Sequence, residues 1–173
     1  MTAWEAIRRV RVVRKFAAKP LPADTVERIL DAGRHAGSSK NQQRWDFIVI
    51  RDREHLAALA EVGAYAGHLA GATIAIALVT PGARTAAASS SVMWDLGRAA
   101  QNMVLSAWEL GIGSVPATVY DHALAARLLG LPDDRRCDFL LSFGYPADTD
   151  ALTAPPKKGG RKPLESVIRE ERW

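Results

Sequence analysis

The sequence predicts a single domain that combines α-helices with short, buried β-strands. Its 173 residues fall within the usual size range of one domain, and no internal repeat divides them. A hydrophobic fraction of 48% with 24% charged residues is typical of a folded globular chain, so global disorder is excluded. Segments with helical spacing of apolar residues alternate with segments rich in β-branched and aromatic residues, which indicates a mixed architecture.

The first half of the chain is predicted to hold three helices and two strands. Prolines in the motif K-P-L-P end the first helix, and glycines lie near the end of the second. The second strand is apolar on both faces, so we expect it at the centre of a sheet. In order, the elements are a helix that begins at Trp4 and ends before Lys19, a helix over 25–37, a strand over 45–52, a short helix over 53–62 and a strand over 73–80.

The second half is predicted to hold two helices, two strands and an irregular tail. The helix over 92–110 is the strongest in the sequence, with a broad stripe of small apolar residues that lets another helix approach closely. Small polar residues at 81–91 predict a mobile loop before it. Residues 147–173 lack apolar periodicity but carry Val167 and Trp173, so we expect this tail to wrap around a partner subunit. The remaining elements are a strand over 114–120, a helix over 122–129 and a strand over 137–145.

Several functional classes lack their characteristic residues in this sequence. The single Cys137 cannot form an intrachain disulfide, and its neighbours predict a strand, so a buried, inert thiol is expected. The four histidines are scattered without metal-ligand spacing, so each is expected at the surface or at a helix end, and no metal site is expected. Phosphate-binding loops, dinucleotide fingerprints and the G-x-S-x-G motif are absent. The charged N-terminus and the short apolar segments favour a reducing cytoplasm over export or a membrane.

The positive charge of the chain is concentrated at its two ends. The formal net charge is +4, but residues 1–19 and 157–173 together carry +8 and the middle carries −4. A nucleic-acid-binding protein usually spreads its charge over one face, so this segregation argues against such binding. We expect instead that something anionic lies where the two ends meet.

Arginines at the two ends are candidates for binding this anion. Arg11 and Arg14 share one face if the first helix continues, and their guanidinium groups suit a phosphate or an electron-rich carbonyl. A solvated basic helix face is the alternative for this pair. In the tail, the glycines of 157–162 either lie in a solvated segment or give the backbone the freedom to lay Arg161 against a phosphate.

A polar loop between a helix and a strand forms a second candidate site. Loops in this position often contact ligands, because a rigid scaffold holds them at the surface. Ordinary loop capping is the alternative here. The hydroxyl and amide side chains of the loop are Ser38, Ser39, Asn41 and Gln43.

Four segments carry a resemblance to a known family. They are V-R-V-V-R-K-F, G-S-S-K-N-Q-Q-R-W-D-F-I-V-I, the helix D-L-G-R-A-A-Q-N-M-V-L-S-A-W-E-L-G-I-G-S, and K-G-G-R-K-P-L-E-S-V-I. Taken in this order, they resemble the FMN-dependent nitroreductase family nearly from end to end. Each segment alone is a weak signal, but four in the family's order make the resemblance specific.

The resemblance implies a nitroreductase-like α+β fold with a central, mostly antiparallel sheet flanked by helices. It also implies one FMN-binding domain over 1–173 and an intertwined homodimer with two FMN sites at the subunit interface. The long helix around Gln101 would form the dimer core, and the C-terminal arm, 155–173, would be exchanged onto the partner subunit.

The resemblance further implies how this chain contacts FMN. Arg11 would approach the phosphate side, and Arg14 the N1 and C2 carbonyl region, where a cation favours the reduced cofactor. The polar loop would reach the ring and ribityl chain of the other subunit's FMN, residues 116–119 would lie along the ring near N5, and Arg161 would hold the phosphate, helped by Lys158 or Lys162. The cofactor-binding residues are thus Arg11, Val12, Arg14, Ser38, Ser39, Asn41, Gln43, Pro116, Ala117, Thr118, Val119, Lys158 and Arg161, with no catalytic side chain.

The activity implied by the resemblance is an FMN-dependent oxidoreductase. It would use NADH or NADPH to reduce electron-poor acceptors, such as nitroaromatics or quinones, by ping-pong hydride transfer. Two alternatives stay open. One is a specialised branch that carries out flavin fragmentation, dehalogenation or deazaflavin-linked chemistry, and the other is a flavin-binding protein without turnover.

The sequence departs from the family pattern beside the N-terminal arginines and beside the polar loop. Val10 and Val12 stand where the family often has Arg and Ser. Either FMN binds more weakly as a result, or a neighbouring arginine of the first helix substitutes. Arg44 replaces the usual Pro and adds a cation beside Trp45, as a possible new contact to substrate.

Overall fold

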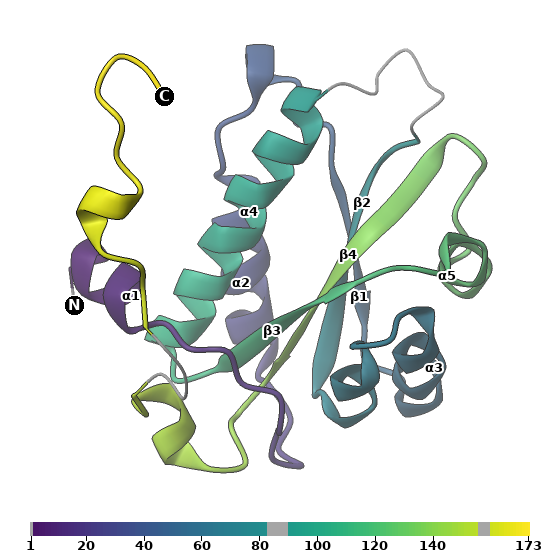
Figure 1. Cartoon of the computed structure of the whole chain (residues 1–173). Coiled ribbons are helices and arrows are strands. Elements are labelled where there is room, and N and C mark those ends of the chain that lie inside the picture. The colour runs from purple at the N-terminus through teal and green to yellow at the C-terminus, as the bar shows by residue number, and fades with distance from the viewer. Residues whose placement is uncertain (1, 83–89, 156–159) are drawn as a thin grey trace.

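A four-stranded antiparallel sheet forms the centre of the structure. The computed structural model describes residues 2–82, 90–155 and 160–173. Every neighbouring pair of strands is antiparallel, in the spatial order β1-β2-β4-β3 (Figure 1). The strands are β1 (Asp46–Ile50), β2 (Ile74–Pro81), β3 (Gly113–Thr118) and β4 (Arg135–Gly144). The antiparallel sheet implied by the resemblance is therefore confirmed.

The central position predicted for the second strand is also confirmed. β2 pairs with β1 on one side and with β4 on the other, and nearly all of its side chains are buried. Because successive residues of a strand point to opposite faces, β2 contributes to two separate apolar clusters. Ala75 and Ala77 belong to one cluster, and Ile76 and Leu78 belong to the other.

Helices cover both faces of the sheet. On one face lie α2 (Ala23–Arg34) and α4 (Ser90–Glu109), and on the other lie α3 (Arg53–Leu59) and α5 (His122–Leu129) (Figure 1). The helices α2 and α4 pack closely because Gly33 faces Met103, which would collide with any Cβ at this position. These four helices match the sequence predictions. Most of the loop predicted at 81–91 lies outside the described residues.

The N-terminal helix is shorter than the sequence suggests. α1 (Ala3–Arg9) begins with a capping box between Thr2 and Glu5 and ends at Val10. The following residues are extended, and Val12 forms a parallel bridge with Ser114 of β3. The expectation that Arg11 and Arg14 share a helical face is therefore wrong. The β-branched Val12 and Val13 favour extended backbone, and they gain backbone pairing with Ser114 at the edge of β3. This pairing explains why the helix ends before them.

The chain after β4 is irregular, as predicted. Its described part holds only two short 3-10 helices, Thr149–Leu152 and Leu164–Ser166. In Figure 1, the last segment passes α1 and lies apart from the sheet. Leu164, Val167 and Trp173 are exposed on it. Within the ranges that the structure describes, no helix has both the length and the apolar character to cross a bilayer.

Candidate functional site

The extended segment after α1 places Arg14 beside the outer edge of β3. Val13 N–H donates to the Ser114 carbonyl (3.0 Å), and the parallel bridge at Val12 sets the register. Continuing this register by two residues puts Arg14 next to Pro116. Arg14, Pro116 and Thr118 are all exposed, and we call these three residues the β3 ledge.

Only part of the predicted segment 116–119 presents side chains to a ligand. Ala117 and Val119 are buried in the cluster beneath α3 and α5, so their side chains pack in the core. Val119 N–H donates to the Asp138 carbonyl (2.9 Å). Because hydrogen-bonded and non-bonded pairs alternate along an antiparallel ladder, Thr118 N–H faces away from β4. The ledge therefore offers one arginine, one proline face and the outward N–H of Thr118.

A histidine lies behind the ledge. His68 Nδ1 is 2.8 Å from Oγ of the buried Ser142, and no partner among the described residues reaches its buried Nε2. Burial lowers the pKa of His68 below its ordinary value of 6.5; a backbone interaction with Pro116 opposes this shift, and the charge of Arg14 adds to it. The lowered pKa therefore favours the neutral form of the ring. His68 is partly buried near the start of a 3-10 helix (Gly67–Gly71), in line with the expected position at a helix end, but its contact with Ser142 forms only through the tertiary fold.

Arg11 is bound to backbone carbonyls. Its Nη1 donates to the carbonyls of Arg8, Arg9 and Val10, each at 3.0 Å, and its Nε donates to the Ala154 carbonyl at 3.1 Å. These bonds satisfy carbonyls at the C-terminus of α1, where helices lack internal partners. Arg11 thus joins the end of α1 to the start of the C-terminal arm.

The other residues predicted near the phosphate make fewer contacts within the described chain. Arg161 is exposed, and Lys158 lies outside the described residues. Val12 leaves 51% of its surface exposed beside the ledge, so the site presents a methyl surface where the family often presents a hydroxyl.

The polar loop has a strained but ordered shape. Lys40, Asn41 and Gln43 have positive φ angles of 53°, 54° and 47°. Left-handed backbone at a non-glycine residue costs about 1–3 kcal/mol, so other contacts must hold the loop. Ser38 Oγ accepts the Gln43 N–H at 2.9 Å, and Gln43 Nε2 donates to Asn41 Oδ1 at 3.1 Å. The remaining loop residue, Ser39, is exposed, but its N–H is bound.

An aspartate that the sequence reasoning missed accepts that N–H. Asp95, in the second turn of α4, is buried, and its Oδ2 lies 2.8 Å from Ser39 N. The two residues are far apart in the sequence, and no local motif connects them. Only the packing of α4 against the loop brings them together.

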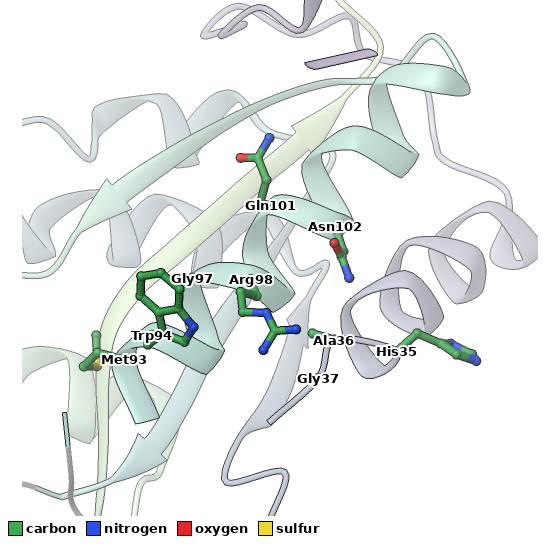
Figure 2. Close-up of a pocket in the computed structure, with 9 residues that line it drawn as sticks. All are labelled: His35, Ala36, Gly37, Met93, Trp94, Gly97, Arg98, Gln101 and Asn102. Carbon is green, nitrogen blue, oxygen red and sulfur yellow. The ribbon is translucent and has the colours of Figure 1, made fainter. Parts of the chain in front are cut away.

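A recess beside the loop was also missed. It has a volume of about 540 Å³ and lies between the end of α2 and the outer face of α4. Figure 2 shows Arg98 directed toward Gly37, where an added Cβ would collide with the guanidinium group. Trp94 lines the same recess and is 72% exposed. The recess therefore extends the polar loop with an aromatic face and a cation.

Within one chain, the polar loop and the junction between α1 and the C-terminal arm lie at opposite ends of α4. The loop contacts Asp95 near the helix N-terminus, whereas Trp108 near the C-terminus donates to the Leu152 carbonyl (3.3 Å), close to where Arg11 binds Ala154. These two points on the helix are roughly 20 Å apart at about 1.5 Å per residue. In Figure 1, the loop between α2 and β1 is at the top of the view, and α1 is at the left, beside the lower half of α4.

Other reactive groups are sparse. Cys137 is buried, as expected, and burial raises the pKa of its thiol to about 12, which disfavours the reactive thiolate. Within the described ranges, no group of three or more His, Cys, Asp or Glu side chains is arranged to hold a metal ion.

Comparison with known proteins identifies the fold and the relatives of the chain. The nitroreductase family model matches residues 7–68 and 61–145. A relative from Archaeoglobus fulgidus, provisionally named an NADH dehydrogenase/NAD(P)H nitroreductase, is 34% identical over 142 residues, which is 80% of this chain and 82% of that protein. The NADPH-flavin oxidoreductase of Vibrio harveyi is 26% identical over 182 residues, with 98% of this chain and 73% of that protein covered.

A solved structure with a bound cofactor is also similar. It is a provisionally named nitroreductase from a Desulfovibrio desulfuricans subspecies in complex with FMN. The TM-score is 0.80 at 28% identity, and the match covers 98% of this chain and 96% of that one. The fold implied by the sequence resemblance is thus confirmed.

Proposed function

The chain belongs to the nitroreductase family, and on this premise we propose that it is an FMN-dependent oxidoreductase. It takes its electrons from NADH or NADPH and reduces an electron-poor small molecule, such as a nitroaromatic or a quinone. The FMN-bound neighbour and the NAD(P)H-linked names of the relatives support the cofactor and the donor. When bound, FMN supplies the two-electron chemistry, accepting a hydride from the nicotinamide and passing electrons to the acceptor.

The donor chemistry of the described residues fits this cofactor. A flavin needs a flat apolar surface for its ring, a hydrogen-bond donor and a positive charge at its polar edge. The β3 ledge offers all three through the face of Pro116, the outward N–H of Thr118 and the guanidinium of Arg14. This combination on one sheet edge is the observation that carries the proposal.

The roles of the ledge residues follow from their charge and direction. Arg14 holds a fixed positive charge, which stabilises negative charge that develops on a ligand beside it. Thr118 N–H, rather than that of Val119, donates to the ring, because Val119 N–H is bound to Asp138. Because burial favours the neutral form of His68, the proposal assigns the positive charge beside Pro116 to Arg14.

We propose that a second copy of the chain completes each site. The polar loop lies at the N-terminal end of α4, away from the junction of α1 and the arm, and in this dimer it contacts the ledge of a partner whose α4 packs alongside. Exposed apolar side chains on α4, on α1 and along the C-terminal arm support such an interface. Trp94, Trp4 and Ile168 are among them. In this homodimer, Ser38, Ser39, Asn41 and Gln43 face the cofactor of the other subunit, and the arm over 155–173 packs on that subunit.

The phosphate is assigned to the arm. Arg11 uses its Nε and Nη1 to bind carbonyls, so it contributes first by ordering the junction between α1 and the arm. Arg161, with Lys158 or Lys162, then provides the main charge for the phosphate. Val12 contributes only its backbone and an apolar surface.

The proposal is tested by purifying the protein and recording its absorbance. We expect the spectrum of bound oxidised flavin, and we expect anaerobic NADH or NADPH to bleach it within seconds. Subsequent addition of a quinone or a nitroaromatic should restore the colour. A protein that retains no added FMN, or whose bound FMN is reduced no faster than free FMN under the same conditions, contradicts the proposal.

A further inference from the structure

Asp95 stands out among the buried polar side chains. Thr80, Ser114 and Ser142 are the other buried polar residues in the described ranges, which makes Asp95 the one carboxylate among them. A carboxylate at 8% exposure is unfavourable unless it accepts hydrogen bonds. Asp95 Oδ2 accepts the Ser39 N–H at 2.8 Å.

This hydrogen bond connects the polar loop to α4. Other hydrogen bonds of residues 38–43 within the described chain run between residues of the loop or to its immediate neighbours. They define a local shape but do not place it. The contact from Ser39 to α4 is the hydrogen bond that fixes the loop relative to a long, well-packed helix.

We propose that Asp95 is a positioning residue for the cofactor site. Its carboxylate anchors Ser39 and thereby holds the strained loop 38–43 in the shape that contacts the FMN of the other subunit. This inference rests on the proposed function for the identity of the ligand. The link between Asp95 and the order of the loop is independent of it.

Two variants and a control separate this role from general stabilisation. Asp95→Ala removes the acceptor, whereas Asp95→Asn keeps a carbonyl oxygen that can accept the same N–H. Glu109→Ala is the matched control, because Glu109 is an acid on the same helix that pairs with Arg28 at the surface, far from the loop. Each protein is measured for FMN affinity, by quenching of flavin fluorescence, and for amide hydrogen exchange.

The expected results are local to the loop. Asp95→Ala should weaken FMN binding about 10- to 100-fold, the range for losing a charged hydrogen bond. Exchange should accelerate at Ser39 and its loop neighbours, while the amides of β2 and β4 keep their rates. Asp95→Asn should recover most of both properties, and Glu109→Ala should match the wild type in both.

Several results overturn the inference. One is an Asp95→Ala protein with FMN affinity within twofold of wild type, and another is faster exchange in β2 and β4 to the same degree as in the loop. If Asp95→Ala does not fold, the wild type still decides: Ser39 should exchange more slowly than Lys40, and equal rates contradict the anchor. A wild type that binds no FMN but shows the exchange pattern contradicts the proposed function and leaves the anchor standing.

Discussion

The two parts of the candidate site are held in place by different means. The β3 ledge is positioned by main-chain pairing, through the ladder to β4 and the bridge between Val12 and Ser114. The polar loop is positioned by side chains, through Asp95 and Ser38, against unfavourable φ angles. We therefore expect FMN binding at the ledge to respond to substitutions that change its charge or its backbone packing. The shape of the loop, in contrast, should respond to the loss of single side-chain hydrogen bonds.

The largest effect is expected for the charge on the ledge. Arg14→Ala should slow reduction of bound FMN by NADH or NADPH about 10²- to 10³-fold, because it removes a fixed charge where negative charge develops. Binding of FMN should weaken much less. Stopped-flow absorbance and fluorescence titration measure the two quantities. Lys15→Ala, at the exposed neighbouring position, should leave both unchanged. Equal losses of rate and affinity in Arg14→Ala would contradict its assigned role.

The next effect tests the backbone packing behind the ledge. A Cβ at Gly113 would collide with Val13, whose segment carries Arg14. Gly113→Ala should therefore lower the free energy of unfolding by about 1–3 kcal/mol and weaken FMN binding at the same time. Urea denaturation measures the first quantity. Gly71→Ala is the control, because nothing lies near its added Cβ. If both variants have the stability of the wild type, main-chain pairing does not hold the ledge.

A smaller effect is expected within the loop. Ser38→Ala removes the acceptor of the Gln43 N–H and should weaken FMN binding by about 2- to 10-fold, the range for one neutral hydrogen bond. The stability of the protein should hardly change, because Ser38 is not part of either apolar cluster. Fluorescence titration and thermal denaturation check the two statements. A loss of affinity larger than that of Asp95→Ala would reverse the order of importance proposed for the loop.

The smallest effect concerns pH. The pKa of His68 is lowered in the folded state, so the unfolded chain takes up this proton at a higher pH than the folded protein does. The contribution of the neutral ring to stability is thus present above pH 6.5 and is lost as the pH falls through the lowered value. The free energy of unfolding of His68→Asn should fall less steeply than that of wild type between about pH 6.5 and pH 5. Parallel curves would show that His68 is not buried as described.

Local signals in the sequence were sufficient for most of the fold. The helix His122–Leu129 was predicted with its observed bounds, because Asp121 caps its start and Gly130 adopts the left-handed conformation at its end. The central strand was recognisable from its unbroken apolar run. The end of α1 was not, because the extended backbone of Val12 depends on pairing with a strand about a hundred residues later.

The residues of the candidate site also fall into those that the sequence could predict and those that it could not. Arg14, Pro116 and Thr118 lie in motifs that the family resemblance made visible. The partners of the site are invisible in the sequence, since Asp95 meets Ser39, and His68 meets Ser142, only after the chain folds. The carbonyl contacts of Arg11 likewise depend on where the C-terminal arm begins, at Ala154.

Mixed dimers test the central claim, that each FMN site combines the ledge of one chain with the loop of another. One chain carries Arg14→Ala, and the other carries Asp95→Ala with Ser38→Ala. At an FMN concentration that saturates the wild type but not the loop variant, each homodimer should show little reduction of FMN by NADPH. After unfolding and refolding together, the mixture should recover about one quarter of the wild-type rate, because half of the dimers are mixed and each has one intact site. A mixture no more active than the average of its two parents would contradict the claim.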